Sequence, residues 1–148
     1  DYNNTAFLDK YEPVKISDSV VRVTKENYKY FRALHNNIEG DMYWDSDRIY
    51  EDIDNWIIFA DIRDNQAAGC VYFMAADNGW FEIFGIDMKD NIFDSDVFQK
   101  LLEKALNAAK ELGGKYMTFF CDEDGEDIVT KLGFKCVGEY VCYKKNLV

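Results

Sequence analysis

The sequence predicts an α/β domain with a mixed, mostly antiparallel central sheet of about six to seven strands and helices on both faces. The first observation is a set of three apolar runs separated by short turns, at residues 56–62, 67–76 and 80–87, which is typical of an antiparallel meander. The second is an amphipathic segment at 95–112 that leads to another strand-like run at 116–121. The third is size, because 148 residues that are 48% apolar suit one domain.

The N-terminal part is expected to contribute one strand and two helices. Residues 1–18 show little periodicity and contain the only proline, so we expect an extended arm or linker ahead of a domain formed by residues 19–148. A short strand at 20–23 leads to Thr24, which suits the N-cap of a helix that Gly40 ends. The first helix would carry Tyr28, Phe31, Leu34 and Ile38 on one face, and the second would span residues 46–54.

Turn signals divide the rest of the chain. Residues 63–66 favour a hairpin, Asp77-Asn78-Gly79 is a stronger turn, and Gly113-Gly114 ends the long helix. The resulting element order is β-α-α-β-β-β-α-β-α-β-β. After the strand at 116–121 we expect a short acidic helix at 124–132 and strands at 134–137 and 140–144.

Charge and cysteine content limit the kinds of partner. The net charge is −11, which repels nucleic acid and anionic lipid and attracts amines, although an acidic surface also serves solubility alone. We therefore expect no nucleic-acid or membrane partner. Four cysteines without CxxC spacing and one histidine predict no metal site, and thiols in apolar runs favour a cytoplasmic location. The acidic segment 122–127 fails calcium-loop spacing. Because the chain starts at Asp1 without a methionine, we expect either that its N-terminus was cut or that it is a piece of a longer protein.

The passage from the third meander strand into the long helix carries most of the functional information. A strand, a short loop and a helix N-terminus bind anions in many folds, because the first helical turn offers free N–H groups and a partial positive charge. The loop here contains Asp90, Asp94 and Asp96 against a single Lys89. The shape therefore favours a phosphate site and the charge opposes one.

Three phrases share an order and spacing with a known family. Residues 56–74 match a first hairpin, with Gly69 at the glycine that opens its second strand. Residues 81–102 (FEIFGIDMKDNIFDSDVFQKLL) match a cofactor strand, loop and helix without insertion, and residues 131–138 (KLGFKCVG) match a late Leu-Gly-Phe turn. Over about residues 20–147 the chain thus resembles the GNAT superfamily of acetyl-CoA-dependent N-acetyltransferases.

The resemblance implies how a cofactor would bind. Acetyl-CoA would lie along the opened end of the strand at 81–88, and an acceptor amine would attack its thioester directly. The pantetheine would pair with backbone near Ile86, Asp87 and Met88. The pyrophosphate would rest on the turn formed by Phe93, Asp94, Ser95, Asp96, Val97 and Phe98.

The sequence departs from the family pattern at this turn. The pattern has Arg or Gln first and small residues fourth and sixth, whereas this chain has Phe93, Asp96 and Phe98 at these positions. Small residues let backbone approach a phosphate closely, and aspartate adds negative charge. In the alternative interpretation, Asp94 and Asp96 cap a helix whose phosphate-binding role has lapsed. Val129 stands where many relatives have a tyrosine general acid.

Glu82 is the candidate catalytic residue. Strand alternation places it on one face with Phe84, Ile86 and Met88, as a carboxylate on an otherwise apolar surface. Such a group suits a base that removes a proton from an ammonium, and the resemblance implies this role because relatives use a glutamate near this position. A structural carboxylate paired with a neighbouring strand or a basic side chain is the equal alternative.

A polar, aromatic loop at residues 41–45 lies where relatives build their acceptor pocket, so the resemblance assigns Tyr43 and Trp44 to substrate binding. Aromatic rings beside carboxylates suit a cationic amine, although loop aromatics more often cover the edge of a core. His35 is expected at the edge of its helix in a packing or surface role. Cys121 is a weak nucleophile candidate, because no histidine is near it in the sequence.

The sequence therefore predicts an N-acetyltransferase that transfers an acetyl group from acetyl-CoA to a small-molecule or peptide amine. The alternative is a catalytically silent GNAT-like module with a structural or ligand-sensing role in a larger protein. The altered turn, the missing tyrosine and the start of the chain favour the module, and the unbroken loop length and Glu82 favour the enzyme. An upstream domain or a homodimer is an expected partner.

Overall fold

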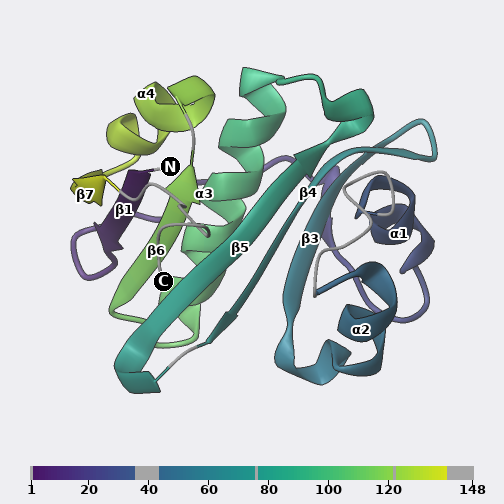
Figure 1. Ribbon diagram of the computed structural model, residues 1–148, viewed down its shortest axis with the longest axis horizontal. Coiled ribbons are helices and arrows are strands. Elements are labelled where there is room, and N and C mark those ends of the chain that lie inside the picture. Colours follow the sequence, from purple (N-terminus) through teal and green to yellow (C-terminus); the bar gives the residue numbers. More distant parts are fainter. Residues whose placement is uncertain (1, 36–43, 76, 122, 140–148) are drawn as a thin grey trace, which may run out of the picture.

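The computed structural model describes residues 2–35, 44–75, 77–121 and 123–139, and these form a seven-stranded sheet with helices on both faces (Figure 1). The strand order is β2-β3-β4-β5-β6-β1-β7, and only the pair β5–β6 is parallel. The mixed, mostly antiparallel α/β architecture expected from the sequence is confirmed. The strands are β1 (Tyr2–Phe7), β2 (Val20–Arg22), β3 (Ile57–Arg63), β4 (Gln66–Ala75), β5 (Trp80–Met88), β6 (Tyr116–Cys121) and β7 (Phe134–Glu139). The helices are α1 (Lys29–His35), α2 (Ser46–Glu51), α3 (Ser95–Glu111) and α4 (Glu123–Lys131).

The meander from β3 to β5 forms as predicted, because two short turns reverse the chain. Between β3 and β4, Asp64 and Asn65 have φ angles of 53° and 62°, the left-handed conformation that a two-residue hairpin turn requires. Between β4 and β5, Asn78 and Gly79 have φ angles of 62° and 81°. Helix α3 then returns the chain so that β6 lies parallel to β5.

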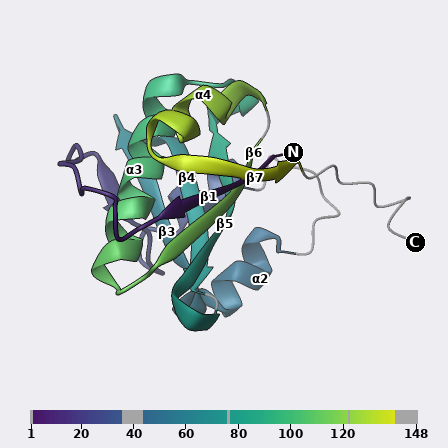
Figure 2. The same ribbon diagram turned by 90° about the vertical axis from the view of Figure 1, so that its left-hand side faces the viewer.

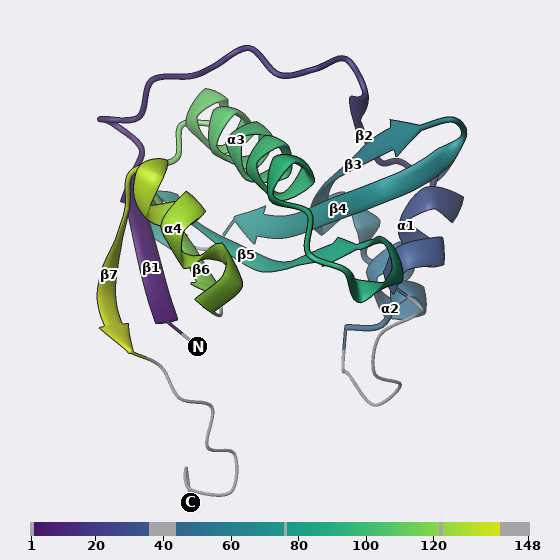
Figure 3. The ribbon, with the colours of Figure 1, turned by 90° about the horizontal axis from the view of Figure 1, so that it is seen from above.

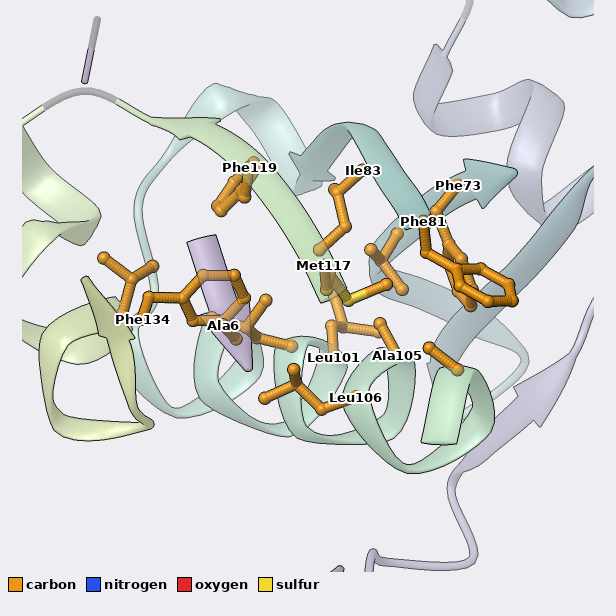
Figure 4. Close-up of a cluster of buried hydrophobic side chains, with 14 of the residues drawn as sticks. Ala6, Phe73, Phe81, Ile83, Leu101, Ala105, Leu106, Met117, Phe119 and Phe134 are labelled. Carbon is orange, nitrogen blue, oxygen red and sulfur yellow. The ribbon is translucent and has the colours of Figure 1, made fainter. Parts of the chain in front are cut away.

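Two apolar clusters hold the layers together. Helices α3 and α4 cover one face of the sheet, and α1 and α2 cover the other (Figure 3). Figure 4 shows Leu101 and Leu106 of α3 in one cluster with Met117 of β6. The buried side chains of α3 follow the predicted helical periodicity and are Val97, Phe98, Leu101, Leu102, Ala105, Leu106 and Ala109. No helix in the described part of the chain is long and apolar enough to cross a bilayer.

The N-terminal strand is the largest difference from the sequence prediction. Instead of belonging to an arm or linker, Tyr2–Phe7 forms β1, which lies between β6 and β7 and is antiparallel to both (Figure 2). Ala6 is buried in the cluster that α3 covers (Figure 4). Leu8 belongs to the same cluster. The following residues cross α3 on the way to β2 (Figure 3), and there the Tyr11 hydroxyl donates to Asn107 Oδ1 over 2.8 Å.

The described parts of the two helices between β2 and β3 differ from the expected ranges. The N–H of Thr24 donates to Asn27 Oδ1 over 2.6 Å, so the residues after Thr24 form a local turn and α1 begins only at Lys29. Helix α2 begins at Ser46 as predicted, and a 3-10 turn, Ile53–Asn55, replaces its expected last residues. Outside the described residues lie Ile38, Gly40 and the strand expected at 140–144.

Candidate active site

The candidate site is built around the second half of β5, which separates from β6. The two strands pair only between Trp80 and Ile83 on the β5 side. From there β5 continues to Met88, paired in the described structure with β4 alone, and the two strands diverge (Figure 1). An extended strand with one open edge can bind an extended ligand through backbone hydrogen bonds.

A β-bulge at Phe84 changes the face that the open half presents. Tyr72 of β4 lies opposite Gly85, whereas its neighbour Phe73 lies opposite Ile83, so β5 has one extra residue between them. Such a bulge bends the strand and increases its local twist. The bulge therefore occurs at the position where β5 leaves β6.

The bulge corrects the predicted position of Glu82. Ile83, before the bulge, is buried in the α3-side cluster, and Ile86 and Met88, after it, pack against the same cluster. Glu82 must therefore face the α1 and α2 side, together with its register partner Met74. The prediction that Glu82 shares a face with Ile86 and Met88 is wrong. The residue inserted at the bulge shifts the two-residue period, so Glu82 lies on the opposite face.

A row of aromatic rings lies on the face that Glu82 shares. The Trp56 ring stands between the rings of Trp44 and Phe84, with centroid distances of 5.2 and 5.0 Å. Trp56 is buried, Phe84 is 40% exposed, and the Trp56 indole N–H has no hydrogen-bond partner among the described residues. Sequence reasoning singled out Trp44 but not Trp56 or Phe84, because their proximity depends on the fold of the sheet. The other predicted substrate residue, Tyr43, lies outside the described residues.

A buried polar cluster connects α1 with the open half of β5. His35, the last residue of α1, is 2% exposed and does not lie at the helix edge as expected. Its Nδ1 is 2.8 Å from Asp87 Oδ2, and its Nε2 is 2.7 Å from the carbonyl oxygen of Trp44. The Tyr72 side chain is also buried near Asp87, and burial together with the negative charge of Asp87 raises the pKa of Tyr72.

The pKa of His35 is raised above its ordinary value. Burial alone lowers this pKa, but the hydrogen bonds to Asp87 and the Trp44 carbonyl, with the charges of Asp87 and Asp45, outweigh burial. The nearby Cys70 thiol is also buried, and desolvation raises its pKa well above the ordinary value. A buried thiol of this kind is a structural rather than a reactive group.

The N-terminal turn of α3 is occupied by its own cap. Asp94 Oδ1 accepts hydrogen bonds from the backbone N–H groups of Asp96 and Val97, at 3.0 and 3.2 Å. The N–H of Phe98 donates to the Asp94 carbonyl oxygen over 2.9 Å. Asp94 therefore forms the expected side-chain cap, and a phosphate can reach these amides only if the Asp94 side chain moves.

The side chains of the predicted pyrophosphate turn point in different directions. Asp96 does not cap the helix but pairs with Arg63 and Lys100, at 3.5 and 3.2 Å, which balances its charge. Val97 and Phe98 are buried in the core, whereas Phe93 and Ser95 are exposed. The position of Phe98 in the core explains why a small residue is absent there.

Two further positions singled out in the sequence are Val129 and Cys121. Val129 is fully buried in the α3-side cluster. The side chain of Cys121 lies outside what the structure describes. Among the described residues, no group of three or more His, Cys, Asp or Glu side chains could hold a metal ion.

No model of a known protein family matches the chain, and no similar sequence is found among curated proteins.

Comparisons of structure find many acetyltransferases. A GNAT-family protein from Novosphingobium aromaticivorans is 13% identical, with a TM-score of 0.71 over 94% of this chain and 65% of its own. An aminoglycoside N-acetyltransferase, AAC(6')-Iy in complex with CoA, is 16% identical, with a TM-score of 0.67 over 91% of this chain and 99% of its own. The IAA acetyltransferase from Bacillus cereus is 15% identical, with a TM-score of 0.66 over 85% of this chain and 83% of its own.

These neighbours identify the class of fold. The chain has the fold of the GNAT acetyltransferases, as its sequence phrases implied. It spans less than two thirds of the length of the N. aromaticivorans protein but nearly all of the aminoglycoside enzyme.

Proposed function

We propose that the chain is an N-acetyltransferase that transfers an acetyl group from acetyl-CoA to an amine. The observation that carries the proposal is the open, bulged half of β5, which leads into the N-terminal turn of α3. The neighbour AAC(6')-Iy has the same fold and was solved with CoA, which supports the same ligand class here.

The described residues fit the pantetheine part of acetyl-CoA better than its pyrophosphate part. An extended chain of amides matches the open edge of β5, where backbone of Ile86, Asp87 and Met88 would hold it. The pyrophosphate would need the first-turn amides of α3, and Asp94 would have to release them. Binding of the phosphates therefore includes the cost of breaking a helix cap, about 1 kcal/mol.

Glu82 would serve as the base. Acetyl-CoA supplies a thioester, whose carbonyl carbon is attacked by the amine nitrogen while the carbon–sulfur bond breaks and the electron pair leaves with sulfur. Glu82, half-buried beside the open edge, would take the ammonium proton directly or through water. A thiol with a pKa of about 8.5 leaves as thiolate, so an aliphatic Val129 is compatible with turnover.

The acceptor would lie on the aromatic row. The partly exposed rings of Trp44 and Phe84 can contact an apolar group or a cation, and Glu82 on the same face can pair with an ammonium. This combination supports a small-molecule or peptide amine that carries an apolar group.

One observation favours the second candidate function, a silent module. Asp94 accepts hydrogen bonds from the amides that a pyrophosphate would use. The N–H groups of Asp96 and Val97 therefore have a hydrogen-bond partner without any ligand. A domain that keeps the fold and loses the cofactor would look the same here.

Calorimetric titration with acetyl-CoA tests the proposal, with dephospho-CoA and desulfo-CoA as controls. The enzyme proposal expects micromolar binding of acetyl-CoA, because backbone of β5 and the helix N-terminus both contribute. No binding at millimolar concentration would reject it in favour of the silent module. Equal binding of dephospho-CoA would show that the 3′-phosphate makes no contact, and retained binding of desulfo-CoA that the thiol is not needed for recognition.

A further inference from the structure

We infer that His35 is a positioning residue, held doubly protonated so that it ties the Trp44 backbone to Asp87 on the open half of β5. Trp44 belongs to the aromatic row of the acceptor, and Asp87 belongs to the strand that would hold pantetheine. The link to catalysis rests on the proposed function. The protonation state of His35 and its two hydrogen bonds, to Trp44 and Asp87, do not depend on that function.

The argument begins with what each hydrogen bond requires. A backbone carbonyl oxygen can only accept, so the Nε2 of His35, 2.7 Å from the Trp44 oxygen, must carry a hydrogen. The Nδ1, 2.8 Å from Asp87 Oδ2, faces a carboxylate, so a second proton must lie between these two atoms. A neutral histidine beside an ionised aspartate has one hydrogen too few.

Packing holds both ring nitrogens against their oxygen partners, whereas burial by itself opposes the charged form of the imidazole. The side chains of His35 and Asp87 are 1% and 8% exposed, so water cannot replace either partner. The ring stacks on Phe31 at 4.9 Å and meets the edge of Tyr72 at the same distance. These contacts hold the ring plane in the orientation that serves both oxygen atoms.

The titratable groups near the ring favour a cation. Strand β5 contributes the Asp87 carboxylate, and Asp45 precedes α2. Strand β4 contributes the Tyr72 hydroxyl and the Cys70 thiol, both protonated near neutral pH because burial raises their pKa. On α1 itself, Arg32 is engaged by Asp47.

Loss of the second proton breaks one of the two links. Either ring nitrogen, once deprotonated, directs a lone pair at an oxygen less than 3 Å away, which is repulsive. The Trp44 backbone or the Asp87 side chain is then released. Both lie beside the open edge of β5, so the acceptor and cofactor sides of the site lose a common support.

The chain has one histidine, so nuclear magnetic resonance can test the inference without ambiguity. In ¹⁵N-labelled protein at pH 7, both imidazole nitrogens should have protonated chemical shifts. As pH rises, the Trp44 carbonyl ¹³C shift should change with the same midpoint as the ring. A neutral tautomer at pH 7, or a Trp44 carbonyl that ignores the titration, would overturn the inference.

Two variants test whether Asp87 is the partner that keeps the His35 ring doubly protonated. Asp87→Asn removes the charge that faces Nδ1, so the ring should be neutral at pH 7. Tyr72→Phe removes the hydroxyl that lies near Asp87 but keeps both contacts of His35, so the ring should stay doubly protonated. A protonated ring in Asp87→Asn would contradict the assigned partner. If either variant fails to fold, the wild-type titration still decides.

An activity readout separates this inference from the proposed function. If acetyl transfer is observed, the KM for the amine should rise several-fold through the His35 midpoint, and kcat should change less. A pH-independent KM with a titrating ring would reject the positioning role. A lack of acetyl-CoA binding would refute the proposed function. The NMR titration would still show whether His35 is doubly protonated and linked to the Trp44 carbonyl.

Discussion

The open half of β5 depends on a residue without a side chain. A Cβ added to Gly85 would lie 2.4 Å from the hydroxyl oxygen of Tyr72 and 2.7 Å from the ring carbon that carries it. Tyr72 cannot move away, because its ring is buried between Phe31, His35 and Trp56. Glycine is therefore required here by close approach.

Gly85→Ala should destabilise the protein by about 1–3 kcal/mol, as overpacked core sites do. Urea denaturation measures the effect. The same change in a Tyr72→Phe background is the matched control, and it should cost less because the nearest atom is gone. Equal losses in both backgrounds would show that the strain lies elsewhere.

Stability should fall as pH rises through the pKa of His35. Because this pKa is higher in the folded protein than the unfolded value of about 6.5, the folded state binds the proton more tightly. The contribution is fully present below about pH 6.5 and is lost as pH passes the folded-state value. The free energy of unfolding, measured by urea between about pH 6 and pH 9, should decline over this window. Asp87→Asn should flatten the decline, and an unchanged slope would contradict the assignment.

Glu82→Gln tests the proposed base. The substitution keeps the shape and removes proton acceptance, so turnover should fall on the order of 100-fold at an unchanged melting temperature. Glu111→Gln is the control, because Glu111 is an exposed carboxylate at the far end of α3. Wild-type turnover in Glu82→Gln would remove Glu82 from the mechanism and leave it a structural carboxylate.

At the level of elements, α3 shows how one helix can serve two purposes. Its buried face anchors the sheet, while its first turn offers amides that Asp94 caps. Serine is as good an N-cap as aspartate but carries no charge. The cap and the charge can therefore be separated by one substitution.

Asp94→Ser should tighten CoA binding, because it keeps the cap and removes one negative charge near the pyrophosphate. One charge at about 4 Å in water is worth about 1 kcal/mol, or roughly five-fold in Kd. Asp96→Ser is the matched control and should change binding less, because Arg63 and Lys100 already balance that charge. Calorimetry measures both, and an unchanged Kd for Asp94→Ser would mean that the phosphates bind elsewhere.

The elements that could be predicted from the sequence are those with a local signal. The meander turns and α3 have strong periodicity and turn chemistry, and both were predicted within a few residues. The bulge at Phe84 was missed because an inserted residue leaves the apolar run unbroken. Strand β1 was missed because YNNTAF has no alternating pattern, and its pairing is entirely long-range.

The candidate site was predicted only in part, because most of its contacts join residues that are far apart in the sequence. Trp44 and Glu82 come from separate parts of the chain and were found through the family resemblance, whose assignment of roles stays a prediction. The contact of His35 with Asp87 joins residues 52 positions apart and has no sequence signal. Buried polar pairs of this kind become visible only when the layers are assembled.

At the level of the whole molecule, β1 holds two parts of the sheet together. It lies between β6 and β7, and in the described structure β7 pairs with no other strand. Helix α4 leads into β7 and packs on α3 and β6, so β1 is the strand that holds the β7 end of this corner. Thr5 sits in the middle of β1, opposite Thr118 of β6 and Lys135 of β7.

Thr5→Pro should therefore loosen β7 and α4 before the meander. Proline removes a ladder N–H and leaves its partner carbonyl unsatisfied, at a cost of about 1–3 kcal/mol. Hydrogen exchange should show faster exchange of the amides of β7 and α4, while those of β3 and β4, on the far side of β5, keep their protection. Thr5→Val keeps the backbone donor and should leave the pattern unchanged. Wild-type protection of β7 in Thr5→Pro would mean that β1 is not what holds β7, and uniform loss across the sheet would mean that the corner does not unfold as a separate unit.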